Sequence, residues 1–203
     1  MIPSLTAVGG APVLVWRLAE PWLALSSAVL GGGLGVRHWV VNATVPDSYG
    51  RLDPDRHLTE IAAALGLTGP GLGFLTAVDV REVVHRSDGG VDVSVTTGIG
   101  DHPTWAAGPA SLASRAEQAG TINAVCWLPR RLSDAALVNA VATVAEAKAQ
   151  AWVSAGVPGT GTPTDSIALL CPVEGAEEPF GGPRSPIGGA LARAVHSAIL
   201  ARL

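Results

Sequence analysis

The amino-acid sequence predicts an α+β fold in which a mixed β-sheet packs against helices. Strand-like apolar segments follow one another directly in the first half of the chain, and they alternate with helices in the second half. The chain has 203 residues, of which 48% are hydrophobic, so it can bury one substantial core. We therefore expect a single domain that spans residues 1–203.

The first strand-like segments are almost wholly apolar. Residues 12–18 and 22–30 predict two short interior strands, separated by Glu20-Pro21. The glycine-rich residues 31–35 follow, and they either form a hairpin or contact a ligand, because glycine lets the backbone approach its neighbours closely. Residues 36–45 predict the next strand, where a dinucleotide-binding motif would need a helix.

Capping residues and apolar periodicity predict three helices. Pro54 opens the first helix, and Gly66 follows its end. Ser133 caps the second helix, which runs to about Ala155. Ser185-Pro186 begins the closing helix.

The remaining strands are predicted around these helices. The segments with strand character are residues 74–80, 82–86, 91–97, 120–128 and 166–173. The second and third of them form a hairpin, because a Ser-Asp-Gly-Gly turn joins them.

Charge and hydropathy exclude several classes of partner. The net charge is −4, with only 13 Lys and Arg residues and no basic run, so we expect no nucleic acid and no acidic membrane surface as a partner. Charged residues, proline and glycine interrupt the N-terminal apolar stretches before they could span a bilayer, and the start lacks the basic region of a signal peptide. These features predict a cytoplasmic protein.

The two cysteines predict neither a disulfide nor a metal site. Cys126 and Cys171 lie far apart in the sequence, and neither has a second thiol or a histidine close by. Two buried thiols in a reducing compartment are the simpler interpretation.

Polar side chains in apolar strands are the first candidates for a binding site. Asn42 must be hydrogen-bonded if it is buried, so it holds either a loop or a ligand carbonyl. Thr121 and Asn123 share one face of a strand, where they position a carbonyl or tie down the neighbouring loop. Asp101-His102 looks like an acid–base pair, but a capped turn is favoured because adjacent extended residues point in opposite directions.

The second helix carries two charged residues that point in different directions. Its helical projection places Glu146 on a polar stripe and Lys148 on the apolar side. Either the stripe faces solvent and Lys148 reaches out of the apolar side, or one of the two charges is buried with a partner. The stripe consists of Asn139, Thr143, Glu146 and Gln150, and the apolar side of Leu137, Val141, Val144 and Trp152.

The turn from Gly159 to Asp165 combines glycines, hydroxyl groups and a terminal carboxylate. It lacks the lysine and the following helix of a nucleoside-triphosphate-binding loop, so it does not predict nucleotide binding. With Glu146 and Lys148 on the preceding helix, it marks residues 119–165 as the region in which to look for chemistry, because sites are commonly built at strand ends.

An ordered set of short motifs resembles the family of adenosylcobinamide amidohydrolases. The motifs are Val40-Val41-Asn42, Gly73-Phe74-Leu75-Thr76-Ala77, Thr96-Thr97-Gly98-Ile99, Ala119-Gly120-Thr121-Ile122-Asn123, Leu132-Ser133-Asp134-Ala135-Ala136-Leu137-Val138-Asn139, Glu146-Ala147-Lys148, Gly161-Thr162-Pro163-Thr164-Asp165 and Gly181-Gly182-Pro183 with Ile187-Gly188. Each motif is weak by itself, whereas the ordered set is specific. The resemblance covers nearly the whole chain from about Leu25.

The resemblance implies hydrolysis of the amide that joins cobyric acid to aminopropanol in adenosylcobinamide, a cytoplasmic step of corrinoid (vitamin B12) salvage. The expected partner is a small corrinoid substrate, and a homo-oligomer remains open. The cobalt belongs to the substrate, so the resemblance implies no cofactor and no metal site in the protein.

Amide hydrolysis needs an attacking oxygen, donors for the developing oxyanion and an acid for the leaving amine. With the resemblance in view, we assign the activation of water to Glu146 or Asp165, and oxyanion stabilisation or amine protonation to Lys148. Asp165 with Lys148 and Glu146 with Asn123 are alternative working pairs. A covalent route through Thr121 or Thr164 is the rival mechanism, because a threonine hydroxyl attacks when a base lies beside it.

The predicted substrate-binding residues are Asn42, Thr121, Asn123, Thr162 and Thr164. The walls of a corrin pocket could include Trp39, Trp105 and Trp127, but a place in the core is favoured for each of them. Two other functions remain open. One is a non-catalytic corrinoid-binding protein, and the other is a threonine-dependent amidase of different specificity.

Overall fold

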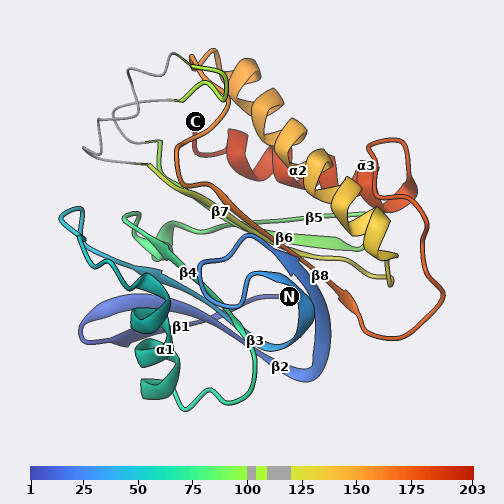
Figure 1. The fold of residues 1–203 in the computed structure, drawn as a ribbon. Coiled ribbons are helices and arrows are strands. Elements are labelled where there is room, and N and C mark those ends of the chain that lie inside the picture. Colours follow the sequence, from blue (N-terminus) through green and yellow to red (C-terminus); the bar gives the residue numbers. More distant parts are fainter. Residues whose placement is uncertain (100–103, 109–119) are drawn as a thin grey trace.

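The computed structural model describes residues 1–99, 104–108 and 120–203. Eight strands of this part form one mixed sheet; α2 and α3 pack beside β6, β7 and β8, and α1 packs beside β2 and β3 (Figure 1). The elements in chain order are β1 Ser4–Val8, β2 Ala11–Ser26, β3 Gly33–Thr44, α1 Pro54–Ala64, β4 Leu72–Thr76, the 3-10 helix η1 Val80–Glu82, β5 Val84–Asp88, β6 Val91–Thr97, β7 Ile122–Trp127, α2 Asp134–Ala155, β8 Ser166–Pro172 and α3 Pro186–Leu200. The predicted α+β fold with a mixed sheet is confirmed.

The sheet has the strand order β4-β3-β2-β8-β7-β6-β5. The pairs β3–β4 and β7–β8 are parallel, and the other pairs are antiparallel. One edge of β2 pairs with β1 near its start and with β8 near its end. The strand β2 therefore joins the two parallel pairs into one sheet.

The prediction of two separate strands at residues 12–18 and 22–30 is wrong. They form the single strand β2, which ends at Ser26. Its pairing with β3 shifts register between Arg17 and Trp22, where Pro21 lacks a backbone N–H for the ladder. The breaker therefore produces an irregularity within one strand. Residues 27–32 then return the chain to β3 as a hairpin loop.

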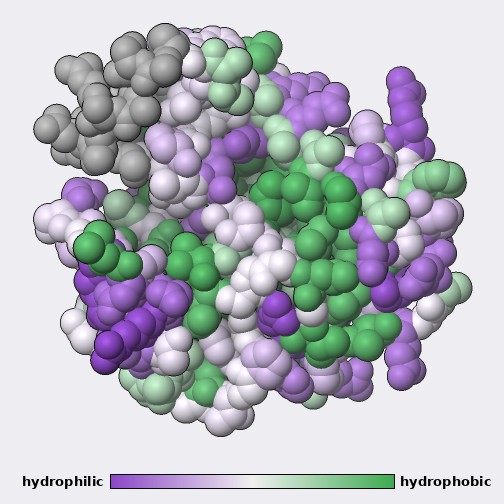
Figure 2. Space-filling model, viewed as in Figure 1, coloured by the Kyte–Doolittle hydropathy of each residue, from purple (hydrophilic) through white to green (hydrophobic). Residues whose placement is uncertain are grey.

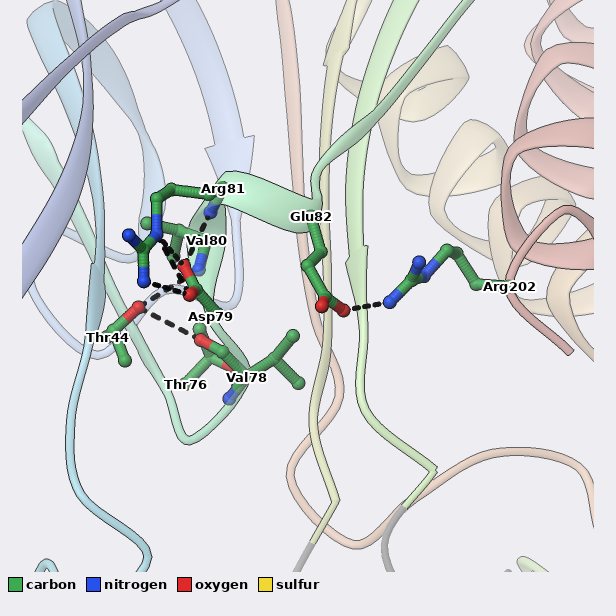
Figure 3. Close-up of polar contacts among 8 residues, drawn as sticks. All are labelled: Thr44, Thr76, Val78, Asp79, Val80, Arg81, Glu82 and Arg202. Carbon is green, nitrogen blue, oxygen red and sulfur yellow. Dashed lines mark hydrogen bonds and ion pairs between the residues drawn. The ribbon is translucent and has the colours of Figure 1, made fainter.

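The prediction of a strand over residues 74–80 is too long. The strand β4 ends at Thr76, and the hydroxyl of Thr44 holds the turn that follows (Figure 3). Thr44 donates to the carbonyl of Val78 at 3.0 Å and accepts from the backbone N–H of Val80 at 3.0 Å. This capping directs the chain into η1, so Glu82 lies in the 3-10 helix and not in the predicted hairpin arm. The strand β1 was not predicted.

The predicted helix caps are confirmed. The hydroxyl of Ser133 accepts from the N–H of Ala136 at 3.2 Å, and Gly156 ends α2 with φ of 70°. The hydroxyl of Ser185 accepts from the N–H of Gly188 at 3.0 Å. The two serine caps satisfy N–H groups that a helix start leaves without partners, and the glycine takes the left-handed conformation that ends a helix.

The core lies on both faces of the sheet. The helices α2 and α3 pack on one face of β6, β7 and β8, as Figure 1 shows. The other face of β7 and β8 packs against β2, β3 and β4 through Trp16, Phe74 and Trp127. Trp39 is also in the core, beside α1, whereas the side chain of Trp105 is exposed. None of the described helices is long and apolar enough to cross a membrane.

Both cysteines are buried, as predicted. Burial raises the pKa of the Cys126 thiol to about 12, and it also raises the pKa of Cys171. The thiols are therefore protonated at neutral pH and behave as small apolar groups.

Substitutions at two neighbouring residues of α2 can distinguish the contribution of core packing to stability from that of helix propensity. The side chain of Trp152 is fully buried, whereas Val153 is 70% exposed. We expect Trp152→Ala to lower the free energy of unfolding by about 3–5 kcal/mol, because it leaves a large cavity. The matched variant Val153→Ala should change it by less than about 0.5 kcal/mol. Urea denaturation followed by circular dichroism measures both, and equal effects would contradict this description of the core.

Candidate active site

A pocket of about 300 Å³ opens where the two parallel strand pairs face each other. The C-terminal ends of β3 and β4 form one wall, and the N-terminal ends of β7 and β8 form the other. The lining residues are Val29, Val45, Pro46, Asp47, Tyr49, Pro54, Phe74, Leu75, Thr76, Ala77, Thr121, Asn123, Thr164 and Ser166. The pocket thus has apolar walls and a small number of convergent polar groups, as small-molecule sites usually do.

Thr121 and Thr164 meet on the wall formed by β7 and β8. Their hydroxyl oxygens are 2.7 Å apart, and Thr164 also donates to the carbonyl of Gly120 at 3.1 Å. Because the single hydrogen of Thr164 goes to that carbonyl, Thr121 is the donor to Thr164. The lone pairs of the Thr121 oxygen remain available at the pocket.

Asn123 is fixed by a chain of buried amides. Its Nδ2 donates to Oδ1 of Asn42 at 3.1 Å and to the carbonyl of Leu75 at 3.1 Å. The Nδ2 of Asn42 donates in turn to the hydroxyl of Thr96 at 3.0 Å. Asn42 is therefore a structural link between β3 and β6 and does not line the pocket. Both Nδ2 hydrogens of Asn123 are used, so its Oδ1 is the atom that a ligand can reach.

Asp165 and Lys148 form an ion pair behind this wall. The carboxylate also accepts from the N–H of Ile122 at 2.9 Å, from the N–H of Thr162 at 3.0 Å and from the Thr162 hydroxyl. Four donors therefore occupy its two oxygens. The pair ties the turn that carries Thr164 to the start of β7 and to α2.

Glu146 lies on the other side of α2, where its side chain is exposed. The polar stripe of α2 faces solvent at Asn139, Glu146 and Gln150, whereas Thr143 is buried and donates to the carbonyl of Gly181 at 2.9 Å. The structure therefore combines the two alternatives from the sequence: most of the polar stripe faces solvent, and Lys148 pairs with Asp165.

The predicted residues accordingly separate into three groups. Thr121, Asn123 and Thr164 line one pocket, and their role in orienting a substrate stays a prediction. Lys148, Asp165 and Thr162 form a cluster next to it, and Asn42 supports Asn123 from below. Glu146 and Asn123 lie on opposite sides of the sheet, because α2 packs on the face of β7 that carries its neighbour Ile122. The pair Asp101-His102 lies outside the described residues.

Comparison with known proteins identifies the family. The family model described as adenosylcobinamide amidohydrolase matches residues 4–203. An adenosylcobinamide amidohydrolase from Halobacterium salinarum is 32% identical over 197 residues, which cover 93% of this chain and 84% of that protein. One from Methanosarcina mazei is 28% identical over 186 residues, which cover 87% and 88%.

This chain belongs to the adenosylcobinamide amidohydrolase family. The resemblance predicted from the ordered motifs is therefore confirmed, and so is the assignment as an amidohydrolase. A solved structure from Pyrococcus horikoshii also matches, with a TM-score of 0.43 and 12% identity over 98% of this chain and 81% of that one.

Several lining residues of the pocket were not predicted from the sequence. Asp47 and Tyr49 lie in the loop after β3, and Thr76 and Ser166 lie at strand ends. The loop signal was present in the polar residues that follow the buried strand around Asn42. Among the described residues, no group of three or more His, Cys, Asp or Glu side chains is placed to hold a metal ion.

The hydrogen bonds of Asp165 predict a stability effect that is separate from any effect on turnover. In Asp165→Asn, an amide NH₂ group replaces one carboxylate oxygen, so it faces donors where an acceptor is needed. We expect the free energy of unfolding to fall by about 1–3 kcal/mol. The exposed Asp55 on α1 has no ion pair in the described residues, so Asp55→Asn is the matched control. Urea denaturation of both variants makes the comparison. If Asp165→Asn left the free energy of unfolding unchanged, this cluster would not be needed for folding.

Proposed function

We propose that this protein hydrolyses the amide between the corrin side arm and aminopropanol in adenosylcobinamide, to give adenosylcobyric acid. The family match over residues 4–203 carries this proposal. Its place in the cell would be the salvage of corrinoids in the cytoplasm. The cobalt enters with the substrate, and the proposal requires no metal or other cofactor from the protein.

The size of the pocket suggests how such a substrate binds. About 300 Å³ is at the lower end of the range for small-molecule sites. This volume suits the amide and the short aminopropanol arm, whereas the corrin ring rests at the mouth. The half-exposed Val29 at the lining offers an apolar contact there.

The polar atoms of the pocket match the two sides of an amide. Oδ1 of Asn123 can accept from the amide N–H, because both Nδ2 hydrogens are already donated. The hydroxyl of Ser166 has no protein partner among the described residues, so it can donate to the carbonyl oxygen. As the carbonyl becomes tetrahedral its oxygen gains negative charge, and a fixed donor then contributes more than it does in the ground state.

The cluster of Lys148 and Asp165 supports this wall. It holds Thr164 and the start of β7, and hence Thr121, in place. We therefore propose a positioning role for the pair. The direct roles predicted for Asp165, Lys148 and Glu146 remain predictions, since none of the three lines the pocket.

One incubation separates the proposed function from the alternatives. Purified protein is mixed with adenosylcobinamide, and the products are analysed by mass spectrometry. We expect adenosylcobyric acid and free aminopropanol, with a rate that a metal chelator does not change. Retention of the intact amide by a protein that binds the corrinoid would support a binding protein instead. Cleavage of a simple chromogenic amide without any corrinoid turnover would indicate an amidase of other specificity.

Variants of Thr121 test the threonine-nucleophile mechanism. If water attacks directly, Thr121→Val should lower kcat by about 10- to 100-fold, because it removes a hydrogen-bond acceptor from the pocket and the hydrogen bond that orients Thr164. Thr121→Ser keeps the hydroxyl and should keep most of the activity. We expect no acyl-enzyme in the intact mass of the wild-type protein during turnover. An adduct that disappears in Thr121→Val would overturn direct attack by water.

A further inference from the structure

We propose that Asp47 and Tyr49 are the proton-transfer groups of this pocket, with His57 as the residue that positions Tyr49. Asp47 takes a proton from the attacking water, and Tyr49 gives one to the leaving amine. The inference rests on the proposed function and names the residues that carry it out. It starts from the fact that Asp47 and Tyr49 are the titratable side chains among the described lining residues.

Both residues come from one short turn. The N–H of Tyr49 donates to the carbonyl of Pro46 at 2.9 Å, which folds the chain directly after β3. Asp47 lies within this turn, so both side chains stand on the same wall of the pocket. They face the wall with Thr121, Asn123 and Ser166 across the space that the amide would occupy.

Tyr49 is held by the first turn of α1. Its hydroxyl lies 3.0 Å from Nδ1 of His57, and the two rings stack with centroids 5.5 Å apart at an interplanar angle of 20°. The N–H of His57 donates to the carbonyl of Asp53 at 3.0 Å, which fixes the base of the pair. The hydrogen bond and the ring contact hold the Tyr49 side chain in one orientation, as proton transfer to a substrate requires.

Burial is the main reason why the Tyr49 hydroxyl stays protonated. Burial raises the pKa of Tyr49, Arg51 opposes this shift, and the carboxylates of Asp53 and Glu60 add to it. Arg51 forms ion pairs with both of those carboxylates. Hydrophilic side chains gather on the surface in the region of α1 (Figure 2). A phenol that keeps its proton at neutral pH serves as an acid.

Asp47 differs from Asp165 in the state of its oxygens. Four donors occupy the oxygens of Asp165, whereas the exposed Asp47 has no ion pair or hydrogen bond from its side chain in the described residues. A carboxylate with free lone pairs can accept a proton from water. Of the two, Asp47 is therefore the one suited to act as a base.

The proposed step conserves atoms and protons. The oxygen of water bonds to the acyl carbon while its proton passes to Asp47. The carbon–nitrogen bond then breaks, and the nitrogen takes the hydroxyl hydrogen of Tyr49 as aminopropanol leaves. The phenolate recovers a proton from Asp47 through solvent. The net change is the addition of one water across the amide.

Two substrates distinguish the acid from the base. One is adenosylcobinamide, and the other is the trifluoroethyl ester of adenosylcobyric acid, whose leaving alcohol needs much less help from an acid. Tyr49→Phe keeps the ring stack and removes the hydroxyl. We expect it to lower kcat for the amide by about 100-fold or more, with little change in KM and with only a small loss for the ester. Asp47→Asn should lower kcat for both substrates by about 100-fold or more, because water attacks in both reactions.

Two further variants and a folding control complete the test. His57→Asn retains a polar atom near Nδ1 and should keep more amide turnover than His57→Leu, while both leave the ester less affected. Asp55→Asn is an acid-to-amide control on α1 outside the pocket and should act like the wild type. Circular dichroism and urea denaturation show whether each variant is folded.

The outcomes separate this inference from the proposed function. If the wild type does not cleave adenosylcobinamide, the proposed function fails. If the wild type cleaves it while Tyr49→Phe or Asp47→Asn turns over the amide normally, the acid–base assignment fails by itself. An equal loss on amide and ester in Tyr49→Phe would make Tyr49 a structural residue and would overturn its role as the acid.

Discussion

The carboxylate of Asp165 is the contact on which the geometry of the site depends. It accepts from the backbone of β7, from the backbone and hydroxyl of Thr162, and from Lys148 on α2. A strand, a turn and a helix are thereby fixed to one another by a single side chain. An ion pair that is partly removed from water is costly unless the remaining lone pairs are satisfied, and here four donors fill the two oxygens. These contacts also fix the position of the adjacent pair Thr121 and Thr164. A site needs such rigidity to hold an amide in one orientation.

A second buried connection crosses the space between the two parallel strand pairs. Asn42 and Asn123 link β3 and β7 through side-chain amides, and Asn123 reaches β4 through the carbonyl of Leu75. In an apolar core such bonds fix the relative position of two elements more closely than side-chain packing does, because an unmade bond there is expensive. The opening between the strand ends therefore keeps its width, and the polar oxygen of Asn123 stays directed at it.

The sequence predicted the helices well and the site only in part. Helix ends were predictable because Ser133, Ser185 and Gly156 act locally, through bonds to residues a few positions away. The strand β2 was not, because Pro21 disturbs the ladder without ending the strand, and only pairing with two neighbours shows this. The tertiary contact of Thr44 that ends β4 is equally invisible in a local pattern.

For the site residues too, positions set by local structure were predictable, and positions set by tertiary contacts were not. Thr121 and Asn123 were placed correctly on one face of a strand, because a strand alternates with a period of two. The helical projection correctly separated Glu146 from Lys148, but it could not tell which of them has a partner. Asp47 and Tyr49 carry no motif of their own, and their position becomes visible only when the loop after β3 is folded against β7 and β8.

The continuity of β2 has a consequence for how the molecule comes apart. Its beginning pairs with β1 and β3, and its end pairs with β3 and β8, so the same backbone belongs to the layers beneath both α1 and α2. If either layer frayed, the strands of the other layer would lose backbone hydrogen bonds to β2. The two layers should therefore unfold in one all-or-none transition. The two walls of the cleft therefore unfold together. A fragment that contains only one wall would lack the other half of the cleft.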